Sequence, residues 1–186
     1  LVAADEELGA LIAQAIRQAG AAGVVSVEEG PGMGVTLEVV DGMQFDRGYL
    51  SPYFVTDADD MEVSLDHPLV LVADAPLVRP NDIVPALELA ARQQRPLLCV
   101  CAEIDTEALA VMVVNRLRGT APGVAVQVPL PPALRHELLE DLALATGAQL
   151  LGPSVGIAPS AVREEHLGRA QRVTAGRDQT TVLRGG

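Results

Sequence analysis

Residues 97–128 read LLCVCAEIDTEALAVMVVNRLRGTAPGVAVQV, and this stretch decides the fold class. It opens with an apolar run at 97–101 and closes with another at 124–128, and each has the length and composition of a buried strand. Between them, residues 106–118 have the length and apolar spacing of a helix. Strand, helix and strand in this order predict a right-handed crossover between two parallel strands.

The same alternation extends to both sides of this stretch. Upstream of it we expect a strand at 69–73 and a helix at 81–94. Downstream of it we expect a helix at 133–146 and a strand at 148–151. Three elements are expected nearer the termini, namely an amphipathic helix at 5–20, a strand pair at 24–27 and 35–40, and a closing strand at 179–182. The predicted fold is α/β with a largely parallel core.

Composition excludes several classes of function. The chain has 186 residues, 49% hydrophobic and 20% charged, which suits one folded domain, and it lacks the run of about 18 apolar residues that a membrane helix needs. Its formal charge of −12, without a basic stripe, argues against nucleic acid as a partner. All 13 cationic residues are Arg, so no lysine is present for a Schiff base or a Walker-type phosphate contact.

No motif in the sequence predicts a catalytic or metal site. The glycines in the stretch GPGMG at 30–34 precede a predicted strand rather than a helix, which does not fit a dinucleotide-binding loop. Cys99 and Cys101 lie in a predicted buried strand, where two reduced core thiols are expected and a redox or metal pair is the alternative. With no disulfide framework and no signal segment, we expect the cytosol as the compartment. The first residue is Leu1 rather than Met, and this leads us to expect a piece of a longer protein.

Two groups of apolar residues exceed what packing against a single sheet requires. All four aromatic residues fall within 45–54, where they form either a local mini-core or an aromatic contact surface. The helix predicted at 106–118 contains seven consecutive apolar residues at 108–114, more than one sheet-facing stripe requires. It is either buried on both sides or leaves an apolar face for a partner, and the helix predicted at 81–94 repeats this pattern.

The segment at 41–54, DGMQFDRGYLSPYF, resembles the signature segment of the apical domain of GroEL-type (group I) chaperonins. Agreement with that family continues at 96–98, 107–109, 113–115, 142–147 and 167–173, so the resemblance covers nearly the whole chain from about Leu8 onward. It implies a GroEL apical-domain-like fold, with a largely parallel α/β core and an additional β-layer. By the same resemblance, residues 1–40 correspond to the end of the intermediate domain and the lead into the apical domain, and residues 41–186 to the apical domain.

The resemblance also implies a function and a set of binding residues. Family members bind non-native polypeptides and the mobile loop of the GroES-type co-chaperonin through an apolar groove, within a homo-oligomeric, ATP-driven ring. The positions matching that groove are Tyr49, Tyr53, Phe54, Val84, Leu87, Leu109, Val113, Val114, Asn115 and Val155. Arg47 is expected to form an inter-domain or inter-subunit contact, and Gly42 and Gly48 to permit a hinge. ATP and Mg would belong to the full-length protein, and no catalytic role is expected for this piece.

The chain departs from the family at two places. Residues 130–133 read LPPA where relatives carry GFGD, so we expect a reshaped loop, and Asp57 stands where many relatives have Lys. Two other functions therefore stay open. One is a divergent chaperonin paralogue with a specialised partner, and the other is a small α/β ligand-binding enzyme domain.

Overall fold

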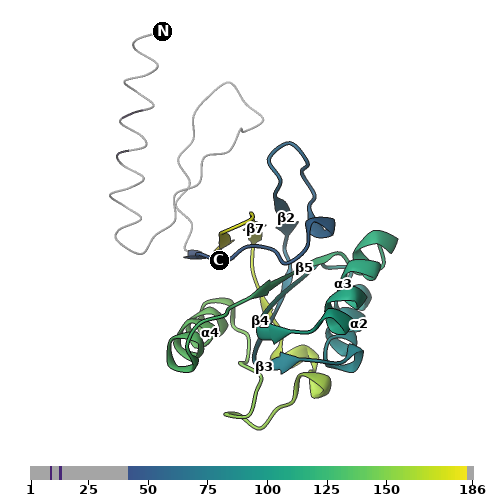
Figure 1. Ribbon diagram of the computed structural model, residues 1–186, viewed down its shortest axis with the longest axis vertical. Coiled ribbons are helices and arrows are strands. Elements are labelled where there is room, and N and C mark those ends of the chain that lie inside the picture. Colours follow the sequence, from purple (N-terminus) through teal and green to yellow (C-terminus); the bar gives the residue numbers. More distant parts are fainter. Residues whose placement is uncertain (1–8, 10–12, 14–41, 184–186) are drawn as a thin grey trace.

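The structure, a computed structural model, describes residues 9, 13 and 42–183 (Figure 1). The helix predicted at 5–20, apart from residues 9 and 13, and the strand pair predicted at 24–27 and 35–40 lie outside the described residues, as does nearly all of the segment assigned to the intermediate domain. The described part is a mixed α/β structure with two four-stranded sheets, and the α/β class predicted from the sequence is confirmed.

The first sheet has the strand order β5-β4-β3-β6. Its parallel strands are β3 (Leu69–Leu77), β4 (Leu97–Ile104) and β5 (Gly123–Gln127), while the two-residue β6 (Gly168–Arg169) runs antiparallel to β3. Residues of β3, β4 and β5 are almost entirely buried, as expected for parallel strands covered on both faces. This parallel core was predicted correctly.

Three helices cover the two faces of this sheet. Helices α2 (Val84–Gln93) and α3 (Thr106–Arg118) lie on one face, and α4 (Pro132–Thr146) lies on the other (Figure 1). The first two connect strands that follow one another in the same direction across the sheet, so crossovers of one hand place them on one side. After the last parallel strand the chain reverses, and α4 returns on the opposite side.

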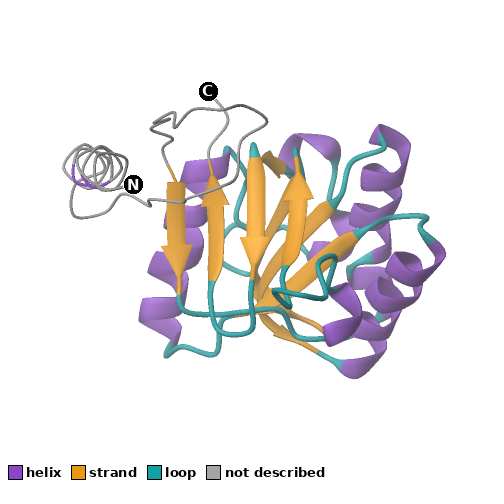
Figure 2. Ribbon diagram, turned by 90° about the horizontal axis from the view of Figure 1, so that it is seen from above, coloured by secondary structure: helices purple, strands orange, loops and turns teal. Residues whose placement is uncertain are grey.

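The second sheet is antiparallel and has the order β1-β8-β7-β2. Its strands are β1 (Gly42–Phe45), β2 (Val63–Asp66), β7 (Arg172–Ala175) and β8 (Thr180–Leu183), and Figure 2 shows them side by side beside the helical layers. The two ends of the described chain meet here, because Gly42 pairs with Leu183. An additional β-layer is therefore present, although the sequence patterns located only its last strand.

One short segment joins the two sheets. After β1 the chain passes close to the turn between β7 and β8, and Tyr49 then forms an isolated antiparallel bridge with Val126 of β5. The backbone N–H of Leu50 continues the contact by donating to the carbonyl of Ala125 at 3.1 Å. The segment thus covers the outer edge of β5.

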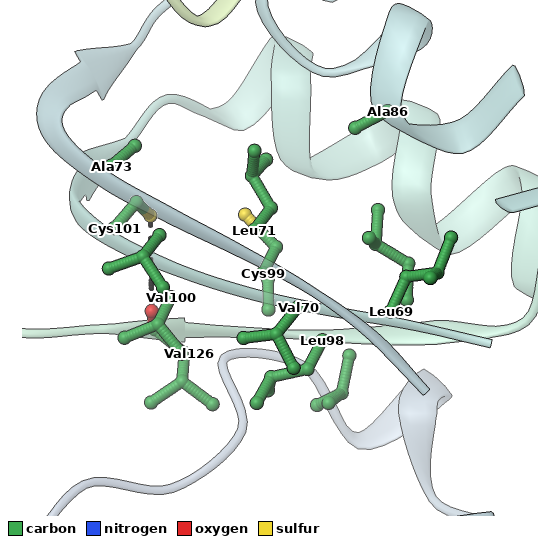
Figure 3. Packing of buried hydrophobic residues seen from close by; sticks show 14 of the residues in the cluster. Leu69, Val70, Leu71, Ala73, Ala86, Leu98, Cys99, Val100, Cys101 and Val126 are labelled. Atoms are coloured by element: carbon green, nitrogen blue, oxygen red, sulfur yellow. Dashed lines mark hydrogen bonds between the residues drawn. The ribbon is translucent and has the colours of Figure 1, made fainter. Parts of the chain in front are cut away.

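The core lies on both sides of β4. Leu71, Cys99 and Cys101 point toward Ala86 of α2, whereas Val70 and Leu98 point to the opposite side (Figure 3). Alternate residues of each strand therefore bury themselves in different layers, as the period of two in a strand requires.

Element boundaries agree with expectation for most of the α/β core. The helix predicted at 106–118 has those bounds, and the one predicted at 81–94 begins later, at Val84, after a 3-10 turn, η2 (Pro80–Asp82). The strand predicted at 148–151 is wrong. Only Leu151 pairs with β3, through one bridge to Ala73, because the chain turns away at Gly152, whose N–H bonds back to the carbonyl of Ile157.

Candidate interaction surface

Helix α3 is apolar on the side that faces solvent. Ala108 and Met112 are buried against the core, while Val114 and Leu117 are exposed, Leu117 to 65%. At about 100° per residue, an arc of about 140° on the outer side carries no charge. Its members are Thr106, Leu109, Ala110, Val113, Val114 and Leu117. The helix is therefore not buried on both sides. Of the apolar run at 108–114, Ala110 and Val114 are exposed, while Leu109, Val111 and Val113 are half-buried and pack against the core.

The charged residues of α3 stand at the borders of this arc. Glu107 is exposed in the first turn, and Arg116 and Arg118 lie in the last turn, where each sign favours the helix dipole. Arg116 also reaches a neighbouring segment, since its Nη2 donates to the carbonyl of Val55 at 3.4 Å. Apart from Thr106, the outer face thus consists of apolar side chains, with ionic groups only at its edges.

The aromatic segment forms a short 3-10 helix, η1 (Pro52–Phe54), which packs against α3. Ser51 begins it with an N-cap side chain that accepts from the N–H of Tyr53. The Tyr53 ring is 62% exposed, Tyr49 is half-buried, and Phe45 and Phe54 are fully inside. Phe45 and Phe54 therefore belong to the main core rather than to a local mini-core, and Tyr53 is the ring exposed beside α3, where an aromatic contact surface stays a prediction.

Two of the predicted binding residues do not reach the surface. The side chains of Phe54 and Leu87 are buried in the core, so neither can contact a partner. Phe54 is the inward residue of η1, and Leu87 lies on the face of α2 that packs against the sheet, one residue after the buried Ala86. The prediction that these two bind polypeptide directly is wrong, and their contribution is to support the surface from below.

The other predicted residues are accessible to different degrees. Val84, Leu109 and Val113 are half-buried, and Val114 is exposed. Val155 is exposed as well, but it lies in the turn between Gly152 and Ile157 rather than on either helix.

Asn115 uses its amide locally. Its Nδ2 donates to the carbonyl of Val111 at 2.8 Å, and its Oδ1 accepts from the hydroxyl of Thr120 at 2.7 Å. These bonds fasten the end of α3, so the side chain serves the helix terminus.

Two exposed apolar residues were missed by sequence reasoning. Leu117 continues the outer arc four residues after Val113, and this spacing could have identified it. Leu50 is also exposed, and it stands within the aromatic signature segment. Leu117 therefore adds to the exposed apolar area of α3, whereas Leu50 lies at the edge of β5.

Arg47 and Gly48 hold the junction between the sheets. The Nη1 of Arg47 donates to the carbonyl of Asp46 at 2.7 Å, and its Nε is buried without a hydrogen-bond partner. The Arg47 side chain forms no ion pair with any residue that the structure describes. A Cβ on Gly48 would lie 2.0 Å from the carbonyl oxygen of Arg177. Gly48 is therefore required for close backbone packing, and the hinge role predicted for it is not supported.

A charged cluster that the sequence did not reveal joins β3 to α4. Asp74 accepts from Arg135 Nε at 2.9 Å and from His136 Nδ1 at 2.8 Å. An ionised carboxylate can only accept, so Nδ1 carries a proton. Burial by itself would raise the pKa of Asp74, but the hydrogen bonds and positive charges of His136 and Arg135 outweigh it and hold that pKa below its usual value. The cluster fixes the start of α4.

The two cysteines are free and buried, as predicted. The hydrogen bond with Cys101, together with burial, raises the pKa of the Cys99 thiol well above its usual range. A protonated buried thiol is a poor nucleophile and a poor metal ligand. Within the described ranges, no group of three or more His, Cys, Asp or Glu residues is placed to share a metal ion.

An open depression of about 590 Å³ lies elsewhere, at the end of α4. Its lining residues are Thr146, Gly147, Glu164, Glu165, Leu167, Gly168 and Arg169. The Thr146 hydroxyl already donates to the carbonyl of Leu142 at 2.8 Å, and Glu165 lies near Arg163 and His166. The depression therefore offers no free buried polar group that would orient a small ligand.

No protein-family model matches the chain. In the part that the structure describes, no helix is long and apolar enough to cross a membrane. The geometry itself defines an α/β domain that exposes an apolar helix face and an aromatic ring side by side.

Proposed function

We propose that this chain is the apical domain of a GroEL-type chaperonin and that it binds non-native polypeptides in the cytosol. The observation that carries the proposal is the outer arc of α3, where apolar side chains face solvent and charges stand only at the borders. Monomeric proteins seldom leave such a face uncovered without an interaction to serve. The proposal is also supported by the resemblance of residues 41–54 to the family's signature segment and by the match of Leu109, Val113 and Val114 to its groove positions.

The chemistry of this surface predicts weak and unselective binding. A fully buried Val or Leu side chain contributes about 1.5–3 kcal/mol, and the half-buried members of the arc can contribute only part of that. Association and ordering of the bound segment together cost at least about 4 kcal/mol. We therefore expect roughly micromolar or weaker affinity for one copy. Selectivity should be low, because apolar burial is non-directional.

The remaining parts of the proposal concern the full-length protein. In a homo-oligomeric ring, several such surfaces facing one client would raise avidity by about 10² to 10⁴. A GroES-type mobile loop would compete with clients for the same surface, and ATP with Mg would act in a domain other than this one. Arg47 is proposed to contact another domain or subunit, since it forms no ion pair with any residue that the structure describes. No catalytic role is proposed for the chain itself.

The test compares two double variants that introduce the same change on opposite sides of the sheet. In Val114→Asp/Leu117→Asp the outer arc of α3 becomes charged, and in Leu134→Asp/Leu144→Asp the change falls on exposed leucines of α4. Binding of a fluorescent apolar peptide, measured by anisotropy, should weaken at least about tenfold for the α3 variant only, which corresponds to about 1.4 kcal/mol. Melting temperatures should stay within a few degrees for both, since these side chains are exposed.

A competition experiment distinguishes binding of the chaperonin type from unspecific binding to an exposed apolar surface. A peptide with the sequence of a GroES-type mobile loop should displace the apolar peptide from the wild-type chain. If apolar peptides bind the α3 variant as well as the wild type, the proposal is wrong. Binding that survives only for one defined partner would instead favour the divergent paralogue.

A further inference from the structure

Helix α4 has an outer side of mixed apolar and acidic residues that nothing in the described structure covers. Its inner side packs through Leu139, Leu142 and Ala143, which are buried. Its outer side nevertheless exposes Leu134 and Leu144, the latter to 78%.

Three carboxylates lie among these leucines. Glu137, Glu140 and Asp141 are exposed, and none of them forms an ion pair with a residue in the described part of the chain. The helix dipole does not explain them, because the first turn of α4 contains no acidic residue and the last turn no basic one. On α2, by contrast, Glu88 lies within 3.7 Å of Arg92.

The face is held in a fixed shape. Pro132 begins α4, and Gly147 ends it in the left-handed conformation at φ 69°. Arg135 and His136 turn inward to Asp74, which ties the first turns to β3. A partner would therefore meet a pre-formed helix and would not have to order it, which favours binding.

We propose that the outer face of α4, defined by Leu134, Leu144, Glu137, Glu140 and Asp141, binds a basic amphipathic helix of another protein. Apolar side chains of that partner cover the leucines, and its Lys or Arg residues meet the three unpaired carboxylates. A second copy of this chain is a poor occupant, because two molecules of formal charge −12 repel each other. The proposal does not depend on the function proposed for α3. The two helices lie on opposite faces of the parallel sheet (Figure 1), so both surfaces can be occupied at once.

The experiment uses a fluorescein-labelled helical peptide of leucine and lysine, and a matched peptide with glutamate in place of lysine. Anisotropy titration of the chain should show binding of the lysine peptide and at least about tenfold weaker binding of the glutamate peptide. Affinity should fall several-fold between about 50 and about 300 mM NaCl, because exposed charges are screened.

Two variants separate a specific site from simple charge attraction. Leu134→Ser/Leu144→Ser keeps every charge, and Glu137→Gln/Glu140→Gln/Asp141→Asn keeps every apolar group. Each should weaken the lysine peptide by about tenfold or more. The control Val78→Ser, at an exposed apolar residue outside α3 and α4, should leave its affinity unchanged. If the leucine variant binds as tightly as the wild type, attraction to the acidic chain alone explains the signal and the proposal is overturned. The same holds if the Val78 control loses binding equally. Circular dichroism of each variant checks that α4 remains folded.

Discussion

Replacing Asp74 by Asn removes the carboxylate that ties β3 to α4. In the wild type its two oxygens accept from Arg135 at 2.9 Å and from His136 at 2.8 Å, and only 14% of the Asp74 side chain is exposed. A hydrogen bond to a charged group contributes about 1.5–3 kcal/mol, and partial exposure of both donors lowers each value. We expect a loss of about 2–3 kcal/mol at pH 7, or about 4–12 °C in melting temperature for a chain of this length.

The loss should depend on pH in one direction. The pKa of Asp74 in the folded chain lies below its usual value of 3.8. A carboxylate with a lowered pKa stabilises the fold above its unfolded pKa, and the contribution disappears as the pH falls through the folded pKa. The difference in unfolding free energy between wild type and Asp74→Asn should therefore be full at pH 6–7 and shrink below about pH 4.

Urea denaturation followed by circular dichroism across this pH range measures the effect. Asp66→Asn is the matched control, because Asp66 also accepts from an arginine, Arg172 Nε at 3.0 Å, but its side chain is 70% exposed. That exposed pair should contribute less than about 1 kcal/mol. A pH-independent difference, or equal losses in the two variants, would refute the reasoning.

Three further predictions follow from single residues. Gly48→Ala should destabilise the chain by about 2 kcal/mol or more, because the new methyl group would lie 2.0 Å from a backbone oxygen, and a melting temperature equal to that of the wild type would contradict this. The Cys99 thiol should resist a thiol reagent in the folded chain and react only in denaturant, since hydrogen bonding and burial raise its pKa, so rapid labelling of native protein would show that β4 opens. Met112→Ala should cost about 2–5 kcal/mol and Leu117→Ala less than about 0.5 kcal/mol, as measured by denaturation, because they lie on opposite sides of α3, and similar losses would mean that the outer arc is packed.

The α/β core could be predicted because its elements are specified locally. The apolar runs have the length of buried strands, and the 13-residue helix at 106–118 has the apolar spacing of a helix, so each pattern is visible in a short window of sequence. The antiparallel sheet has no such signal, since its strands are only four residues long and Gly42 pairs with Leu183 at the far end of the chain. Pairing at that separation depends on tertiary contacts that a sequence window does not contain.

The sequence indicated which helix carries the candidate surface, but it did not indicate correctly which of the residues are exposed. Composition alone indicated that α3 has more apolar residues than a sheet-facing stripe needs. Which ones face water depends on neighbours from other elements, and for this reason Phe54 and Leu87 turned out to be buried and Leu117 was overlooked. Asp74 and His136 are likewise 62 positions apart and meet only in the folded chain.

The segment around Tyr49 has a consequence for how such a chain avoids polymerising with itself. A parallel sheet normally ends in a row of unpaired amides onto which a foreign strand can add. Here the bridge to Val126 and the bond to Ala125 pair part of the outer edge of β5, and at the other border of the same sheet β6 extends for only two residues. At β5 a foreign strand would therefore have to displace the segment around Tyr49 before it could add to the sheet.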